Sequence, residues 1–89
     1  ELNQVAVWRE YPSGTVVCKE GELEHTFYVI ESGMVSVTRR LNDDSDQVLG
    51  VLRDGQFFGE MGLLDDVPRA ATIRTMTTCS LIELSEETF

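Results

Sequence analysis

Short runs of β-branched and aromatic residues, separated by glycine and polar residues, fill most of this 89-residue chain. Val35 and Val37 alternate with Ser36 and Thr38, which is the pattern of a strand with one buried face. Runs of this kind predict strands bounded by turns. The predicted strands are Thr15–Cys18, Thr26–Ile30, Met34–Leu41, Gln47–Leu52, Ala70–Thr75 and Ser80–Leu84. Six to eight strands in so short a chain indicate a jelly-roll-like double sheet or a small barrel.

Three segments depart from this period and predict helical additions. Apolar residues at helical spacing predict a short helix over residues 2–8. Residues 60–65 predict a helical turn inserted between two strands. Ser85, followed by two glutamates, has the character of an N-cap with acids in the first turn, so a helix is expected to start there.

The composition indicates one folded domain and limits its partners. Hydrophobic residues make up 42% of the chain, as in an ordinary globular domain, and no apolar run approaches the length of a membrane span. The net charge is −9, with 16 acidic and 7 basic residues. Phosphate contacts to nucleic acid need Lys and Arg, and anionic membranes attract the same residues. We therefore expect this domain by itself to bind neither nucleic acid nor a membrane.

The residues that enzymes of this architecture use are scarce. His25 is the only histidine, whereas a cupin-type metal centre needs several. No arrangement for a nucleophilic catalyst is apparent either, so we expect no enzyme, no catalytic residue and no metal, although a small-molecule jelly-roll enzyme stays as an alternative. Cys18 and Cys79 lie far apart without a C-x-x-C spacing. Buried free cysteines in a reducing cytosol are expected, while a disulfide stays open.

The most informative segment joins a glycine, a glutamate and an arginine within a few residues. Gly59 allows the backbone to approach a ligand closely, and the first N–H groups of the helical turn after it form an anion site. Arg69 adds a planar cationic fork that is suited to phosphate. Glu60 repels phosphate, but it fits a ligand that also offers hydroxyl donors, as a ribose does. Phosphate and ribose together indicate a nucleotide.

These residues resemble the phosphate-binding cassette of cyclic nucleotide-binding domains, with its pattern F-G-E-x-small-L-L, a short loop and R-x-A-T. Flanking segments match the same family over roughly residues 9–89, namely Tyr11–Val17, Glu20–Glu22, the F-Y-x-I-x-x-G-x-V-x-V pattern of residues 27–37, and Leu52, Gly55 and Phe57. The resemblance implies an all-β fold, a double-stranded β-helix (jelly-roll) barrel with short flanking helices and a helical phosphate-binding cassette.

The resemblance also implies a role for each matching residue. Glu60 would accept a hydrogen bond from the ribose 2′-hydroxyl, and Arg69 would pair with the exocyclic phosphate oxygens. Backbone N–H groups near Gly59 and Gly62 would hold the phosphate. The Met61 side chain is expected to pack, as are Leu63 and Leu64. The implied ligand-binding residues are Gly59, Glu60, Met61, Gly62, Arg69, Ala70 and Ala71. Arg53 and Arg74 lie outside the motif and are interpreted as surface residues, whereas the aromatic Trp8, Phe27 and Tyr28 are interpreted as core residues.

The implied function is that of a regulatory sensor module. In the family, a hydroxyl directly after the cassette arginine favours cGMP, whereas Ala70 has none, so cAMP is the expected ligand and no other cofactor is implied. An effector domain in the same chain is the expected partner, a homodimer is a further candidate, and the expected location is the cytoplasm or the cytoplasmic face of a membrane protein. We interpret residues 1–89 as one domain cut from a longer protein, without its C-terminal helices. The alternative is a degenerate member that serves as an interaction or dimerisation module without a ligand.

Overall fold

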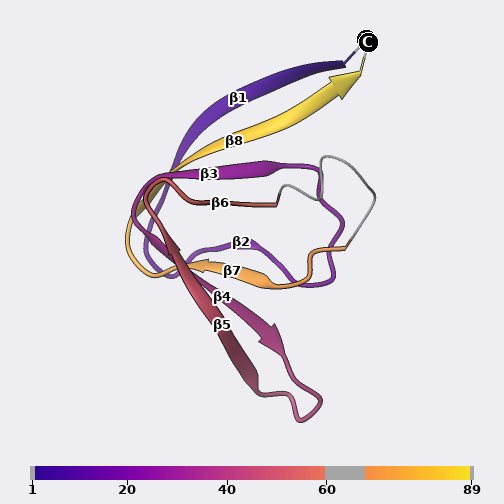
Figure 1. Ribbon diagram of the computed structural model, residues 1–89, viewed down its shortest axis with the longest axis vertical. Helices are drawn as coiled ribbons and strands as arrows, with labels where there is room; N and C mark the ends of the chain where they lie inside the picture. The colour runs from indigo at the N-terminus through magenta and orange to yellow at the C-terminus, as the bar shows by residue number, and fades with distance from the viewer. Residues whose placement is uncertain (1, 60–67, 89) are drawn as a thin grey trace.

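The computed structural model describes residues 2–59 and 68–88, and within them the chain forms two four-stranded antiparallel sheets (Figure 1). One sheet has the strand order β1-β8-β3-β6 and is called the β8 sheet here; the other has the order β2-β7-β4-β5 and is called the β4 sheet. The strands are β1 (Leu2–Tyr11), β2 (Val16–Cys18), β3 (Phe27–Ser32), β4 (Met34–Arg40), β5 (Asp46–Arg53), β6 (Phe57–Phe58), β7 (Thr72–Thr75) and β8 (Cys79–Thr88).

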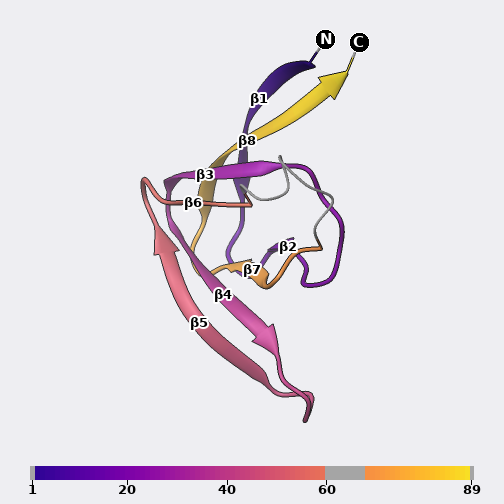
Figure 2. The ribbon, with the colours of Figure 1, turned by 45° about the vertical axis from the view of Figure 1, so that its right-hand side comes forward.

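Buried side chains from both sheets form the core. Ile30 and Leu81 are paired on β3 and β8, and Val35 supplies the β4 sheet; all three are fully buried. The remaining core members are Cys18, Tyr28, Phe58, Ile73 and Cys79. The β1–β8 pair extends away from this core at the end where both termini lie, while the β4–β5 hairpin extends at the other end (Figures 1 and 2). Val35 is buried, and the half-buried Val37 packs against the core, which agrees with the predicted inward face of this strand.

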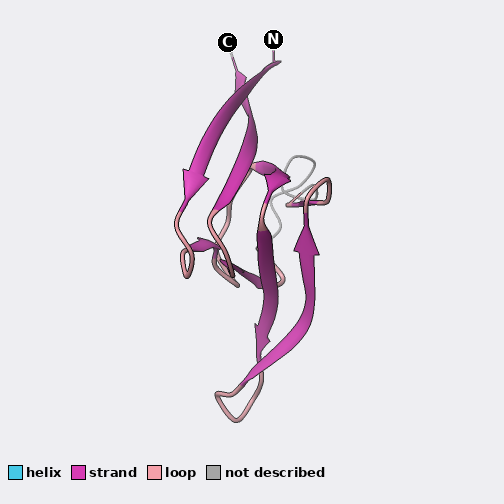
Figure 3. Ribbon diagram, turned by 90° about the vertical axis from the view of Figure 1, so that its left-hand side faces the viewer, coloured by secondary structure: helices cyan, strands magenta, loops and turns pink. Residues whose placement is uncertain are grey.

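Each of the six predicted strand segments overlaps an observed strand, with ends shifted by up to four residues. The jelly-roll prediction is also confirmed, since the described residues form the two-sheet, all-β arrangement (Figure 3). The two-residue strand β6 was not predicted, because a pair of phenylalanines is too short to show a period. The predicted helical turn over residues 60–65 lies outside the described residues.

The predicted flanking helices are wrong where the structure describes them. Residues 2–8 lie in strand β1, which pairs with β8 along its whole length from Leu2↔Thr88 to Tyr11↔Cys79. The same pairing continues β8 through Ser85, the predicted N-cap, as far as Thr88. Seven residues are too few to separate the two periods, so the hydrogen bonds offered by a neighbouring strand override the local signal. No helix among the described residues is long and apolar enough to cross a membrane.

The outer face of the β8 sheet is unusually apolar. The strand register places Trp8, Ile82, Val29 and Phe57 side by side across all four strands. Trp8 is 61% exposed and Phe57 54% exposed, so the prediction that Trp8 lies in the core is wrong, whereas Tyr28 is buried as predicted. Antiparallel sheets with one face in water usually alternate apolar-in with polar-out, and this sheet therefore departs from that pattern.

Candidate functional site

The loop that carries Arg69 is held against the turn after β2 by main-chain hydrogen bonds. The Arg69 N–H donates to the Glu22 carbonyl at 2.9 Å, and the Gly21 N–H donates to the Arg69 carbonyl at 2.8 Å. An isolated bridge joins Leu23 to Pro68 beside them. Because both the N–H and the C=O of Arg69 form main-chain hydrogen bonds, its backbone position is fixed independently of the contacts of its side chain.

The Arg69 side chain is directed inward and is only 8% exposed. Its Nη1 donates to the Gly59 carbonyl at 3.2 Å, and its Nη2 donates to the Thr26 carbonyl at 2.5 Å. Among the described residues, the buried Nε has no hydrogen-bond partner. A guanidinium carries five N–H donors, and a buried donor without a partner costs free energy. The group therefore retains donor capacity for an acceptor that the described protein residues do not supply.

Gly59 meets this guanidinium at the end of β6. Its φ of 86° lies in the left-handed region, and a Cβ built there would lie 2.6 Å from Arg69 Nη1 and 2.8 Å from the Thr26 carbonyl oxygen. Only glycine therefore fits without displacing its neighbours. The preceding residue, Phe58, is buried and stacks on Tyr28 with ring centroids 4.8 Å apart, which anchors the strand that delivers Gly59.

A polar cluster surrounds the same position. A Glu24 carboxylate oxygen lies 3.9 Å from Arg69 Nη2 and accepts a hydrogen bond from the Tyr28 hydroxyl at 3.2 Å. Burial, with the nearby Glu24 carboxylate as a second cause, raises the pKa of the Cys18 thiol from its ordinary 9.0 to about 12. Burial is also the main cause that raises the pKa of the Tyr28 hydroxyl. Neither group therefore adds a negative charge beside Arg69 near pH 7, and Glu24 is the carboxylate that faces it.

These raised pKa values predict a loss of stability at alkaline pH. The Cys18 thiol ionises near pH 9 in the unfolded chain but only near pH 12 in the folded one. Its contribution is thus complete below pH 9 and is lost as the pH rises from 9 towards 12. Urea unfolding between pH 7 and 11 should show a free energy of unfolding that falls above pH 9, and Cys18→Ala should have a shallower decline. A free energy that stays level to pH 11 would contradict this expectation.

The structure brings together two of the residues that the resemblance assigned to the ligand, Gly59 and Arg69. Ala70 and Ala71 follow Arg69 directly; Ala70 is exposed and Ala71 is half-buried. The other assigned residues, Glu60, Met61 and Gly62, lie outside the described residues. Sequence reasoning missed the partners of Arg69, since a backbone carbonyl such as that of Thr26 leaves no signature in the sequence.

Chemically, the arrangement suits the binding of an anion without bond making. A buried, permanently charged fork lies beside a glycine, which is the combination that recognises phosphate. Among residues 2–59 and 68–88, no three His, Cys, Asp or Glu side chains gather as metal ligands.

Comparison with known proteins finds relatives that share this fold over nearly the whole chain. The family model described as "Cyclic nucleotide-binding domain" matches residues 8–89. The CRP-like protein Clp of Xanthomonas campestris is 41% identical over 80 residues, which are 89% of this chain and 35% of that protein. The chain thus spans about a third of this curated relative's length.

Two solved structures superpose closely on the chain. The c-di-GMP-responsive global regulator CLP of Xanthomonas campestris has a TM-score of 0.82 at 40% identity, over 90% of this chain and 39% of that one. The regulatory domain of Toxoplasma gondii PKA, solved with cAMP, has a TM-score of 0.85 at 29% identity, over 90% of this chain and 30% of that one. With the family model matching nearly the whole sequence and the barrel superposing on these regulators, the chain belongs to the cyclic nucleotide-binding domain family.

Proposed function

We propose that this domain is a sensor that binds a cyclic nucleotide through Arg69 and controls an attached effector without catalysing a reaction. The observation that carries the proposal is the Arg69 guanidinium, which is more than nine-tenths buried, lies against Gly59, and has an unpartnered Nε among the described residues. A ligand phosphate would supply the missing acceptor and form paired, charge-assisted hydrogen bonds with the fork. To form these bonds, the guanidinium would give up part of its hydrogen bonding to the Gly59 and Thr26 carbonyls and bind the ligand instead.

The other contacts follow the family pattern. Glu60 would accept the ribose 2′-hydroxyl, and backbone N–H groups from Gly59 to Gly62 would hold the phosphate, with Met61 contributing through its backbone. Exchange of the Gly59 and Thr26 hydrogen bonds would couple ligand binding to the end of β6 and the start of β3. A ligand that favours one arrangement of these contacts shifts their population, which supplies a signal for an effector domain or for a second copy of the chain.

We propose cAMP as the ligand and c-di-GMP as the second candidate. The Toxoplasma gondii PKA regulatory domain, which shares this fold, was solved with cAMP, and Ala70 lacks the hydroxyl that favours cGMP. The c-di-GMP-responsive regulator CLP, however, is the more similar in sequence at 40% identity. Two free, buried cysteines among the described residues fit the reducing cytoplasm proposed for such a sensor.

Calorimetric titration with cAMP, cGMP and c-di-GMP tests the proposal directly. We expect saturable binding of cAMP, tighter than that of cGMP, and loss of that binding in Arg69→Gln. If c-di-GMP binds more tightly than cAMP, c-di-GMP becomes the proposed ligand. Absence of heat with all three nucleotides, in a protein shown to be folded by circular dichroism, would reject nucleotide sensing and favour a degenerate interaction module.

Nucleotide preference is expected to depend on the residue after Arg69. A bound cGMP meets no side-chain acceptor at Ala70 for its 2-amino group, a cost of about 1 kcal/mol where the pocket is only partly closed. Ala70→Thr adds a hydroxyl, and because Ala70 is exposed the change should leave the fold intact. Competition titrations should show that cGMP affinity rises in the variant while cAMP affinity changes little. An unchanged ratio would mean that selectivity is determined elsewhere.

A further inference from the structure

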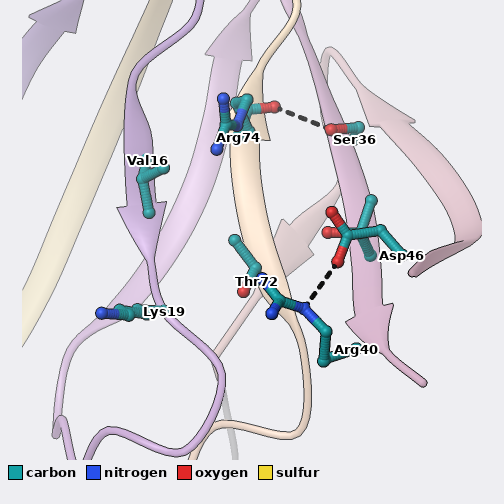
Figure 4. Close-up of a pocket in the computed structure, with 8 residues that line it drawn as sticks. Val16, Lys19, Ser36, Arg40, Asp46, Thr72 and Arg74 are labelled. Carbon is teal, nitrogen blue, oxygen red and sulfur yellow. Dashed lines mark hydrogen bonds and ion pairs between the residues drawn. The ribbon is translucent and has the colours of Figure 1, made fainter. Parts of the chain in front are cut away.

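The outer face of the β4 sheet carries a cluster of cations that is separate from Arg69. A hollow of about 560 Å³ is lined there by residues of β2, β4, β5 and β7 and by Lys19, which directly follows β2; the strand residues are Val16, Ser36, Thr38, Arg40, Asp46, Thr72 and Arg74. Figure 4 shows Thr72 near the middle of this set, with Arg74, Lys19 and Arg40 around it. This volume falls within the range of small-molecule pockets, about 300–1,000 Å³.

The charge of the hollow is opposite to that of the chain. Three of the seven basic residues line it, although the whole chain has a net charge of −9. Arg40 Nε is paired with Asp46 at 3.1 Å, and no described carboxylate forms an ion pair with Lys19 or Arg74. Two cations therefore face the hollow without a counter-ion from the residues that the structure describes. Such a concentration of like charge favours an anion.

Hydroxyl groups lie between these cations because of the strand register. Arg74 pairs with Ser36 and Thr72 pairs with Thr38 across β7 and β4. The Thr72 hydroxyl accepts a hydrogen bond from the Glu20 N–H at 3.1 Å, which leaves its own proton available to a ligand. Glu20 is the other acid nearby, and its carboxylate accepts a hydrogen bond from the Arg40 N–H at 2.8 Å.

This surface is distinct from the Arg69 site. Strand β7 alternates, with Ile73 and Thr75 buried while Thr72 and Arg74 face outward. The sheet itself therefore separates the hollow from the interior, and a ligand in one place does not occupy the other.

We propose that this outer hollow binds a small molecule bearing phosphate groups, with Arg74 and Lys19 as its cationic contacts and the threonine hydroxyls as donors. The fork of Arg74 matches phosphate oxygens in pairs, and Lys19 adds a point charge from just beyond the neighbouring strand β2. Cations on separate strands with hydroxyls between them suit a compact ligand with several charged oxygens. A carboxylate offers one charge and two acceptor oxygens, whereas a phosphate offers nearly two charges and three oxygens, so an acidic peptide is the weaker match.

Titration of the ¹⁵N-labelled chain with sodium pyrophosphate, at constant ionic strength, tests this inference. The amide shifts should concentrate at Lys19, Thr38, Thr72 and Arg74. Arg74→Gln should weaken pyrophosphate binding by at least about fivefold. Arg53→Gln, an equal charge change at an exposed arginine outside the hollow, should leave binding within about twofold of the wild type.

Three results would overturn the proposal. Shifts spread over all basic residues, or an equal loss in both variants, would show general charge attraction only. Shifts centred on Gly59 and Arg69 would assign pyrophosphate to the nucleotide site. A polyglutamate peptide that shifts the outer-face amides where pyrophosphate does not would assign the surface to an acidic protein partner. Neither variant alters Arg69, so failure of the outer-hollow proposal and failure of nucleotide binding at Arg69 are distinguishable.

Discussion

Replacing Arg69 by lysine should weaken cyclic nucleotide binding by about 1.5–3 kcal/mol, the scale of a hydrogen bond to a charged group, or from about tenfold to more than a hundredfold. Lysine keeps the charge but has one nitrogen in place of a planar fork, so it cannot pair two phosphate oxygens. Its donors also lie on one nitrogen, whereas Arg69 reaches the Gly59 and Thr26 carbonyls from two separate Nη atoms. Calorimetry of wild type and Arg69→Lys with cAMP measures the difference.

The matched control for this variant is Arg53→Lys, since Arg53 is exposed on β5. It should bind cAMP like the wild type. Thermal unfolding of Arg69→Lys should show a cooperative transition, with at most a modest fall in midpoint from the lost carbonyl contact. Wild-type affinity in folded Arg69→Lys would mean that this arginine does not contact the ligand.

Alanine at Gly59 should destabilise the fold and abolish tight nucleotide binding together. Two costs act at this position. The left-handed conformation, with φ of 86°, costs an L-residue about 1–2 kcal/mol. The new Cβ would also meet Arg69 Nη1 at 2.6 Å and the Thr26 carbonyl at 2.8 Å. Displacing the guanidinium so that it loses one of its two carbonyl acceptors should add about 1.5–3 kcal/mol, the scale of one hydrogen bond to a charged group.

Gly55→Ala separates these two costs. Gly55 has nearly the same φ, 85°, but a Cβ there meets nothing within 4 Å. The control should therefore lower the melting temperature through backbone strain alone, by about 4–16 °C for a domain of this size. Gly59→Ala should melt at least about 4 °C lower still and lose cAMP affinity, whereas Gly55→Ala should bind normally. Equal melting temperatures with normal binding in both variants would show that the crowding at Gly59 has no consequence.

The elements that could be predicted from the sequence are those with a strong local signal. Met34–Arg40 alternates Val35 and Val37 with polar residues, and the sheet buries the valine face as that period requires. The functional segment was also recognisable, because two of its residue types have properties that others lack. Gly59 can adopt a positive φ, and Arg69 has a planar side chain that is always charged. That the Arg69 side chain donates to the Gly59 carbonyl was not predicted and comes from the structure.

The flanking segments illustrate where a local signal fails. Residues 2–8 and the Ser85 region each have a plausible helical pattern, and each is a strand because the other is present to pair with it. Neither segment contains information about its partner some eighty residues away. Pairing between distant segments is decided by the whole fold. It outweighs local helix preferences, which amount to only about a few tenths of a kcal/mol per residue.

By itself, the sequence determined the strand periods, the acidic character of the chain, and the presence of a glycine and an arginine suited to a phosphate, since all of these are properties of residues and their spacing. Only the tertiary structure decided that the guanidinium of Arg69 is buried against the Thr26 carbonyl with its Nε unpartnered, and that Lys19, Arg40 and Arg74 gather on one outer face. The physical reason is that a backbone carbonyl has no distinguishing residue type, and residues on separate strands become neighbours only through the register of the sheet.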